Sequence, residues 1–217
     1  MIKEKKEQKM KVINLIGAPG SGKSTTMLGM TYQMKMLGLS VENTPEYFKE
    51  LILEGTDKCR FGGQLMVLAE QNKRLDRCVE KNDFVITDCP LPLIGYYTHK
   101  AGGYVSSFDN MSMELFEMYD NVVYFIERTH AFEEEKRNHG DKESRIIEQE
   151  LPKYLEDRGV TFKKVKSHNG LVDDIIKDLI LSNVIKAEQL KNNRIDPVLY
   201  NSIKHLNVKH LNKRKDI

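Results

Sequence analysis

A glycine-rich turn near the start of the chain carries the strongest chemical signal in the sequence. Residues 17–24 read G-A-P-G-S-G-K-S, which fits the pattern G-x-x-x-x-G-K-[ST]. In that pattern the glycines let several backbone N–H groups point inward at phosphate oxygens. Lys23 then reaches the β- and γ-phosphates, and the Ser24 hydroxyl binds Mg²⁺. The turn is therefore predicted to hold a nucleoside triphosphate, with ATP as the expected ligand.

The residues around the turn support this prediction. Residues 12–16 form a short apolar run that fits a buried strand, and residues 24–37 can form a helix. The positive N-terminal end of that helix would face a bound phosphate. A glycine turn followed by a surface lysine is the alternative explanation. Phosphate contacts are expected from nine consecutive residues: Gly17, Ala18, Pro19, Gly20, Ser21, Gly22, Lys23, Ser24 and Thr25.

Asp88 is the second candidate, because it closes the apolar run F-V-I-T-D. A carboxylate at the carboxyl end of such a strand can hold Mg²⁺ through water or accept a proton from an attacking hydroxyl. Alternatively, Asp88 caps the next turn, before Cys89 and Pro90. Many ATPases that activate water have an Asp-Glu pair at this point, whereas this chain has Asp-Cys-Pro. The difference disfavours a motor ATPase. Ser24 and Asp88 together are the predicted metal ligands.

Glu46 lies just past the second apolar run, within V-E-N-T-P-E-Y-F-K-E-L. It could bind acceptor hydroxyls or act as a base, and Tyr47 and Phe48 could stack on a flat ring. Alternatively, Thr44 caps a helix, Pro45 takes its first position, and Glu46 sits in the first turn, where the helix dipole favours an acid. The two interpretations are compatible. Three further residues could line the same pocket, although each alone is more typical of the surface: Arg60, Gln64 and Gln71.

Cations that close over the transferred group are expected from residues 127–155. Arg137 and Arg145 are the preferred candidates, with Arg128 as a third. A solvated, salt-bridged helix over residues 142–158 is the alternative for this segment. After the last apolar run, the loop S-H-N-G at residues 167–170 could contact adenine through its backbone and Asn169, although a plain helix-starting turn is equally consistent.

The order of elements predicts an α/β fold with a parallel sheet. Candidate strands are residues 12–16, 39–43, 84–87, 122–126 and 160–165, and an amphipathic helix is expected over residues 172–180. Five strands in this order suit a three-layer, nucleotide-kinase-like P-loop NTPase fold. A further helix over residues 61–80 is expected to bury one stripe of side chains: Phe61, Leu65, Leu68, Leu75 and Val79.

Composition narrows the class of protein. The chain has 217 residues, 40% hydrophobic and 30% charged, as expected of a globular protein with room for one α/β domain. No apolar run approaches the length of a membrane span, and the N-terminus lacks the apolar segment of a signal peptide. The three cysteines are too few and too dispersed for a disulfide framework or a zinc site. A cytoplasmic protein with reduced thiols is therefore expected.

Both ends of the chain are basic. Residues 1–11 carry five Lys/Arg against two Asp/Glu, and residues 186–217 carry eight against three. Such ends can be nucleic-acid arms or simply solvated termini, so nucleic acid stays open as a partner, as does a homo-oligomer. The expected organisation is a basic arm at 1–10, a kinase domain at 11–185 and a basic extension at 186–217.

Taken in order, these motifs resemble a known family. The P-loop, E-N-T-P-E-Y-F-K-E-L, G-G-Q-L-M-V-L-A-E-Q-N-K-R-L-D-R-C, F-V-I-T-D-C-P-L and the arginine-bearing segment are similar to the ribosylnicotinamide-kinase-like P-loop kinases. Thymidylate and adenylate kinases are similar at longer range. The resemblance covers roughly residues 11–181. It implies that Glu46 and Asp88 face the substrate, whereas residues 186–217 have no counterpart in the family pattern.

The sequence therefore predicts a Mg²⁺-dependent kinase. It would transfer the γ-phosphoryl group of ATP to a nucleoside, a nucleotide or a related small molecule. Lys23, Asp88, Glu46, Arg137 and Arg145 are the predicted catalytic residues. Two alternatives stay open: a kinase that acts on nucleotides within DNA or RNA, and a P-loop ATPase that serves as a switch or binds a partner.

Overall fold

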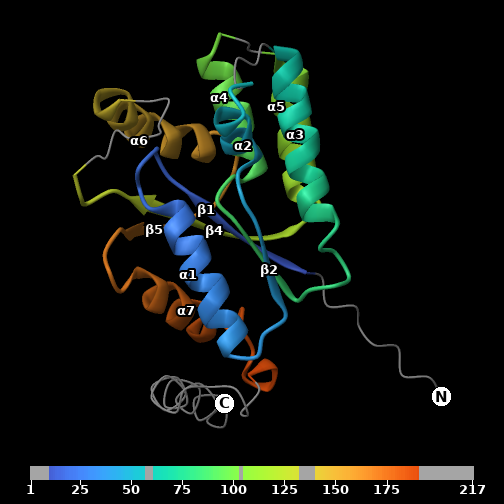
Figure 1. The fold of residues 1–217 in the computed structure, drawn as a ribbon, viewed down its shortest axis with the longest axis vertical. Coiled ribbons are helices and arrows are strands. Elements are labelled where there is room, and N and C mark those ends of the chain that lie inside the picture. Colours follow the sequence, from blue (N-terminus) through green and yellow to red (C-terminus); the bar gives the residue numbers. More distant parts are fainter. Residues whose placement is uncertain (1–9, 57–60, 103–104, 132–139, 191–217) are drawn as a thin grey trace, which may run out of the picture.

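The computed structural model describes residues 10–56, 61–102, 105–131 and 140–190. These residues form an α/β fold around a parallel sheet with the strand order β2-β3-β1-β4-β5 (Figure 1). The predicted three-layer fold with a five-stranded parallel sheet is confirmed. The strands are β1 (Lys11–Ile16), β2 (Val41–Thr44), β3 (Phe84–Thr87), β4 (Asp120–Glu127) and β5 (Lys163–Lys166).

The register of the central strands determines where the site forms. β1 is buried at five of its six positions because it lies between β3 and β4. Thr87, the last residue of β3, pairs with Thr44 of β2 and with Asn14 of β1. The carboxyl ends of these three strands therefore meet at one edge of the sheet. The loops that leave this edge carry the P-loop, Glu46 and Asp88.

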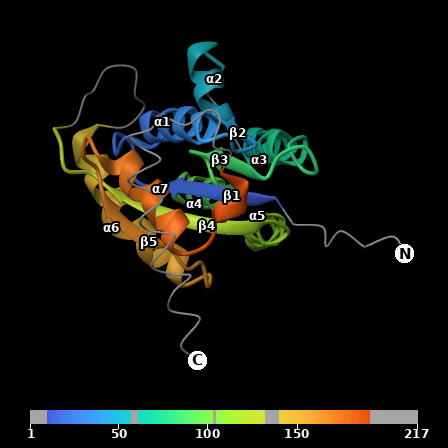
Figure 2. The same ribbon diagram turned by 90° about the horizontal axis from the view of Figure 1, so that it is seen from below.

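Helices connect the strands and cover both faces of the sheet (Figures 1 and 2). The helices expected near residues 24–37, 61–80, 142–158 and 172–180 are all present, whereas α4 and α5 were not anticipated from the sequence. Within the described residues the helices are α1 (Lys23–Met36), α2 (Tyr47–Leu53), α3 (Phe61–Asp76), α4 (Leu91–Lys100), α5 (Ser106–Glu117), α6 (Asp141–Glu156) and α7 (Leu171–Leu181), followed by the 3-10 turn η1 (Ala187–Gln189).

The sheet separates two hydrophobic cores. One core joins a face of β1 to α1 and α7, through residues such as Leu15, Met30 and Ile176. The other core joins the opposite face to α2, α3, α4, α5 and α6, through residues such as Val12 and Leu151. Side chains alternate between the faces of a strand, so β1 contributes to both cores. Each core is apolar enough to hold its layer of helices on the sheet.

Two sequence predictions need correction. Leu65 was expected in the buried stripe of α3 but is 40% exposed, because α3 turns Val67, Leu68 and Leu75 inward instead. The last strand was expected over residues 160–165 but spans Lys163–Lys166. Val160 packs in the core before the strand begins, so the apolar residues that suggested a strand belong to its approach. In the ranges that the structure describes, no helix combines the length and apolar character needed to cross a membrane.

Candidate active site at the carboxyl edge of the sheet

The P-loop has the backbone conformation that its glycines allow. Gly20 and Gly22 have φ values of 82° and 91°, in the left-handed region that side chains strongly disfavour. At Gly17 a Cβ atom would lie 2.6 Å from both the Ile126 carbonyl oxygen and Ser21 Oγ. Three glycines of the motif are thus required by local geometry. Helix α1 begins directly after the turn, at Lys23.

The polar side chains of the P-loop are arranged around this backbone. The Lys23 amine donates to the carbonyl oxygens of Gly17 and Ala18, at 2.9 and 3.0 Å, so it lies across the turn. Ser21 Oγ is completely buried and makes no hydrogen bond within the described part of the chain. A buried hydroxyl without a partner is costly unless a ligand satisfies it.

Asp88 connects the P-loop with the loop that carries Glu46. Its side chain is only 1% exposed, and both carboxylate oxygens accept hydrogen bonds. Oδ2 accepts from the Ser24 hydroxyl at 2.5 Å, and Oδ1 accepts from the backbone N–H of Glu46 at 3.0 Å. The Asp88 carboxylate therefore links the P-loop to the loop that carries Glu46, which are the two predicted halves of the site.

The loop between β2 and α2 is held by buried side chains from two other elements. Thr87 Oγ1 donates to the Thr44 carbonyl oxygen at 3.0 Å. Gln71 of α3 accepts from the Tyr47 N–H at 3.0 Å and donates to the Pro45 carbonyl oxygen at 3.4 Å. These contacts place Glu46, which is half-buried, at the entrance to α2.

Two predictions for this loop are wrong. Thr44 does not cap α2, because it is the last residue of β2 and is held in register by Thr87. Helix α2 begins at Tyr47, with Glu46 at the N-cap position. Gln71 was considered more typical of the surface, yet it is completely buried. Only its helical spacing of four residues from Val67 and Leu75 could have indicated this.

Arg74 supports the same loop one turn after Gln71. Its guanidinium donates to both carboxylate oxygens of Glu50 at 2.7 and 2.6 Å, in a bidentate pair. It also lies 4.8 Å from the centre of the Tyr47 ring, and it contacts Glu70 within α3. The guanidinium lowers the pKa of Glu50 below its ordinary value, chiefly through these hydrogen bonds. Because Arg74 is engaged by two carboxylates, it links α2 to α3.

Two groups near Glu46 and Asp88, the Cys89 thiol and the Tyr97 phenol, keep their protons at physiological pH. Burial raises the pKa of the Cys89 thiol well above its ordinary value, and the carboxylates of Glu46 and Asp88 raise it further. Burial likewise raises the pKa of the Tyr97 phenol, and Glu46 adds to that shift. The part of the site predicted to face an acceptor thus combines two carboxylates with neutral polar groups. Cys89 and Cys78 are both free thiols, and Cys59 lies outside the described residues.

Two of the three candidate arginines, Arg128 and Arg145, pair with Asp141 at the start of α6. The Arg128 guanidinium donates to Asp141 at 2.5 Å, and its backbone N–H donates to Glu148 at 2.7 Å. Arg145 also donates to Asp141, at 3.0 Å, and its side chain is 68% exposed. Both guanidinium groups lower the pKa of Asp141. Arg145 remains a predicted catalytic residue, and Arg137 lies outside the described residues.

Helix α6 also contacts the P-loop directly. The Ser144 hydroxyl donates to the Pro19 carbonyl oxygen at 2.7 Å, a contact that no sequence motif indicated. On the other side, a Cβ atom on Gly22 would lie 3.3 Å from Ser167 Oγ, so the loop after β5 borders the turn. Asn169 is exposed in this loop, and its role in binding adenine remains a prediction.

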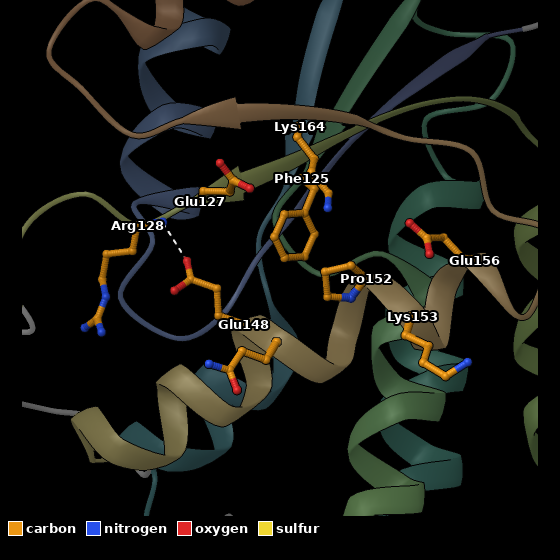
Figure 3. Close-up of a pocket in the computed structure, with 9 residues that line it drawn as sticks. Phe125, Glu127, Arg128, Glu148, Pro152, Lys153, Glu156 and Lys164 are labelled. Atoms are coloured by element: carbon orange, nitrogen blue, oxygen red, sulfur yellow. Dashed lines mark hydrogen bonds between the residues drawn. The ribbon is translucent and has the colours of Figure 1, made fainter.

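An open groove of about 610 Å³ lies beside the site, between α6 and the strands β4 and β5 (Figure 3). Phe125 and Lys164 form its strand side, and Pro152 and Glu156 form its helix side. Arg128 stands at one end, where its backbone bond to Glu148 closes the wall (Figure 3). No P-loop residue lines this groove, so it is separate from the predicted phosphate site.

The donor set for a metal ion is small. Over the described residues no group of three or more His, Cys, Asp or Glu side chains is arranged to hold a metal. Ser24 and Asp88 offer one hydroxyl and one carboxylate, side by side. This set fits Mg²⁺, which typically binds one or two protein oxygens, retains several waters and takes its remaining ligands from substrate phosphates.

The fold and the P-loop define a P-loop protein with the parallel sheet of the nucleotide-kinase fold. The chain belongs to the AAA domain family, whose model matches residues 12–170. Among curated proteins, none matches the chain.

Solved structures show the same fold at low sequence identity. NadR protein in complex with NR superposes with a TM-score of 0.58 and 15% identity, over 76% of this chain and 50% of NadR. The chain thus spans about half the length of NadR. Thymidylate kinase from Ehrlichia chaffeensis gives 0.54 and 15%, over 79% and 98%. Deoxyadenosine kinase from M. mycoides with bound dCTP gives 0.50 and 14%, over 79% and 99%. The predicted resemblance to P-loop kinases is confirmed at the level of the fold.

Proposed function

We propose that the protein is a kinase that transfers the γ-phosphoryl group of ATP to a hydroxyl of a nucleoside-like small molecule. The observation that carries this proposal is the position of Asp88, which bonds both to Ser24 of the P-loop and to the backbone of Glu46. A phosphoryl-transfer site must hold donor and acceptor in line, and this carboxylate lies between the two loops that would do so.

The donor side fits ATP and Mg²⁺. The unpartnered Ser21 hydroxyl and the left-handed glycines suit a turn that wraps phosphate oxygens. Ser24 and Asp88 would hold Mg²⁺, which neutralises charge on the phosphates when bound. Lys23 supplies a fixed cation beside the transferred group. These roles are consistent with the kinases that share the fold.

The acceptor side favours a hydroxyl over a phosphate. In the described part of the chain it presents the carboxylates of Glu46 and Asp88 beside neutral Cys89 and Tyr97. Arg74 is engaged by Glu50 and Glu70. Among the described residues on this side, the two carboxylates suit a hydroxyl, from which they can accept a hydrogen bond, better than a phosphate of their own sign. The acceptor oxygen attacks the γ-phosphorus, the bond to the β–γ bridging oxygen breaks, ADP leaves, and Asp88 or Glu46 takes the hydroxyl proton.

The test is a screen for label transfer from γ-labelled ATP. Nucleosides, nucleoside monophosphates and oligonucleotides are offered separately, with and without Mg²⁺, to the wild-type protein and to Lys23→Ala. We expect transfer to a nucleoside that depends on Mg²⁺ and on Lys23. Transfer to an oligonucleotide, with strongly salt-dependent binding, would instead support a polynucleotide kinase. Hydrolysis that no acceptor stimulates would support an ATPase switch and contradict the proposal.

A further inference from the structure

Gln71 is a buried polar side chain that the proposed reaction does not use directly. Its exposed fraction is 0%, so it cannot contact an acceptor. Both ends of its amide are nevertheless engaged by one short loop: Oε1 accepts from the Tyr47 N–H at 3.0 Å, and Nε2 donates to the Pro45 carbonyl at 3.4 Å. These two backbone groups flank Glu46 in the sequence.

We infer that Gln71 is a positioning residue that holds Glu46 in register with Asp88 for binding of the acceptor. The inference rests on the proposed function. The Glu46 N–H donates to Asp88 Oδ1, which holds the backbone at this point. Gln71 holds the peptide groups on either side of Glu46, so the backbone there is fixed from two directions. In effect, α3 positions the backbone from which the Glu46 carboxylate extends.

The packing of α3 makes this constraint rigid. Three residues of α3 lie in the core, each exposed by 2% or less: Val67, Leu68 and Leu75. Because the core is closely packed, the helix resists shifting with the loop. Arg74 adds a second contact from the same helix, to Glu50 and to the Tyr47 ring. A single amide at position 71 can therefore transmit the position of the core to Glu46.

Two substitutions separate hydrogen bonding from packing. Gln71→Met keeps the length and shape of the side chain but removes both hydrogen bonds. Gln71→Glu can accept from the Tyr47 N–H in either protonation state, but it can donate to the Pro45 carbonyl only when its carboxyl group is protonated. Burial raises the pKa of such a carboxyl group. Gln149→Met, on the exposed side of α6, is the matched control.

The kinetic test measures KM for ATP and for the acceptor in each variant. We expect Gln71→Met to raise the acceptor KM about tenfold while the ATP KM stays unchanged. The pH dependence is read as the ratio of the variant kcat/KM to the wild-type kcat/KM at each pH. For Gln71→Glu this ratio should rise as the pH falls from about 8.5 to about 6, whereas for Gln71→Met it should not change. Equal changes in both KM values, or a flat profile for Gln71→Glu, would overturn the inference.

A second measurement does not depend on activity. Hydrogen exchange of the Tyr47 amide, corrected for its intrinsic pH dependence, should accelerate in Gln71→Met but remain protected in Gln149→Met and in Gln71→Glu, which keeps an acceptor for this N–H. Unchanged exchange in Gln71→Met would overturn the inference even if the enzyme is active. If the wild-type protein transfers no phosphoryl group, the proposed function is refuted. The exchange experiment would then still test whether Gln71 holds the Tyr47 N–H.

Discussion

Replacing Asp88 by Asn should separate the structural role of this side chain from its chemical role. An Asn keeps one oxygen to accept from the Glu46 N–H and turns an NH₂ group toward Ser24, whose hydroxyl can accept as well as donate. Both contacts therefore survive as neutral hydrogen bonds. Exchanging two charge-assisted bonds for neutral ones costs about 1–2 kcal/mol, which lowers the melting temperature by only a few degrees.

The chemical cost should be much larger. The amide can neither hold Mg²⁺ as a carboxylate does nor accept the acceptor proton. Removing one such electrostatic group typically lowers turnover by about 10²–10³-fold, and we expect that loss with every acceptor. Asp88→Ala should lose turnover equally but also destabilise the fold by about 1–3 kcal/mol, because the Glu46 N–H loses its acceptor.

The assay combines Mg²⁺-dependent label transfer with thermal unfolding. Asp120→Asn is the matched control, since Asp120 pairs with Lys11 at the opposite edge of the sheet and is 41% exposed. That pair should contribute less than about 1 kcal/mol, and its loss should leave transfer unchanged. Full Mg²⁺-dependent activity in Asp88→Asn would refute the role assigned to Asp88.

Four further predictions concern the P-loop, Glu46, the pair of Glu50 with Arg74, and the C-terminal end of the chain. Lys23→Ala should keep its melting temperature but lose at least about 10²-fold in turnover, and near-normal turnover would remove the P-loop from the chemistry. Glu46→Gln should act mainly on the acceptor KM; an equal change in the ATP KM would contradict this. The Arg74 pair lowers the pKa of Glu50 below its ordinary 4.5, so it stabilises the protein above that pH and loses this contribution as the pH falls through the lowered value. Glu50→Gln should therefore flatten the acid side of a stability curve measured by urea unfolding, and an unchanged curve would show that the pair is not stabilising. A chain that ends at Leu190, which packs against the core of α1 and α7, should keep kcat/KM for a small acceptor within a few-fold. If the folded, shortened chain instead binds oligonucleotides more weakly, with a slope of log K against log salt concentration reduced by about 0.7–0.9 per lost phosphate contact, that result would favour a kinase that acts on polynucleotides.

The parts of the fold with simple local patterns could be predicted from the sequence. Strand β3 was predicted at its observed bounds because three apolar residues and a threonine stand between two aspartates. The P-loop was evident because its glycine spacing is tied to one backbone shape. Helix α4 was missed because Leu91–Tyr96 are buried on all sides, so no amphipathic pattern marks them.

The coupling within the site could not be read from the sequence. The sequence indicated Asp88 and Glu46 separately, but the hydrogen bond between them depends on the register of β2 with β3. Gln71 resembled a surface residue because its partners are backbone groups, which leave no trace in residue types. Ser144 was missed for the same reason, since it bonds to the Pro19 carbonyl.

The division of the interior into two cores has a consequence for how such a protein can evolve. The helix that follows the P-loop packs on one side of the sheet, and α2, α3 and α4 pack on the other. Substitutions in the second layer can reshape the side of the site proposed to bind the acceptor without repacking the first. If the proposed function holds, acceptor preference is free to diverge between relatives while the P-loop stays constant. The residues that resist such drift are the few that bridge the layers, of which Asp88 is the clearest.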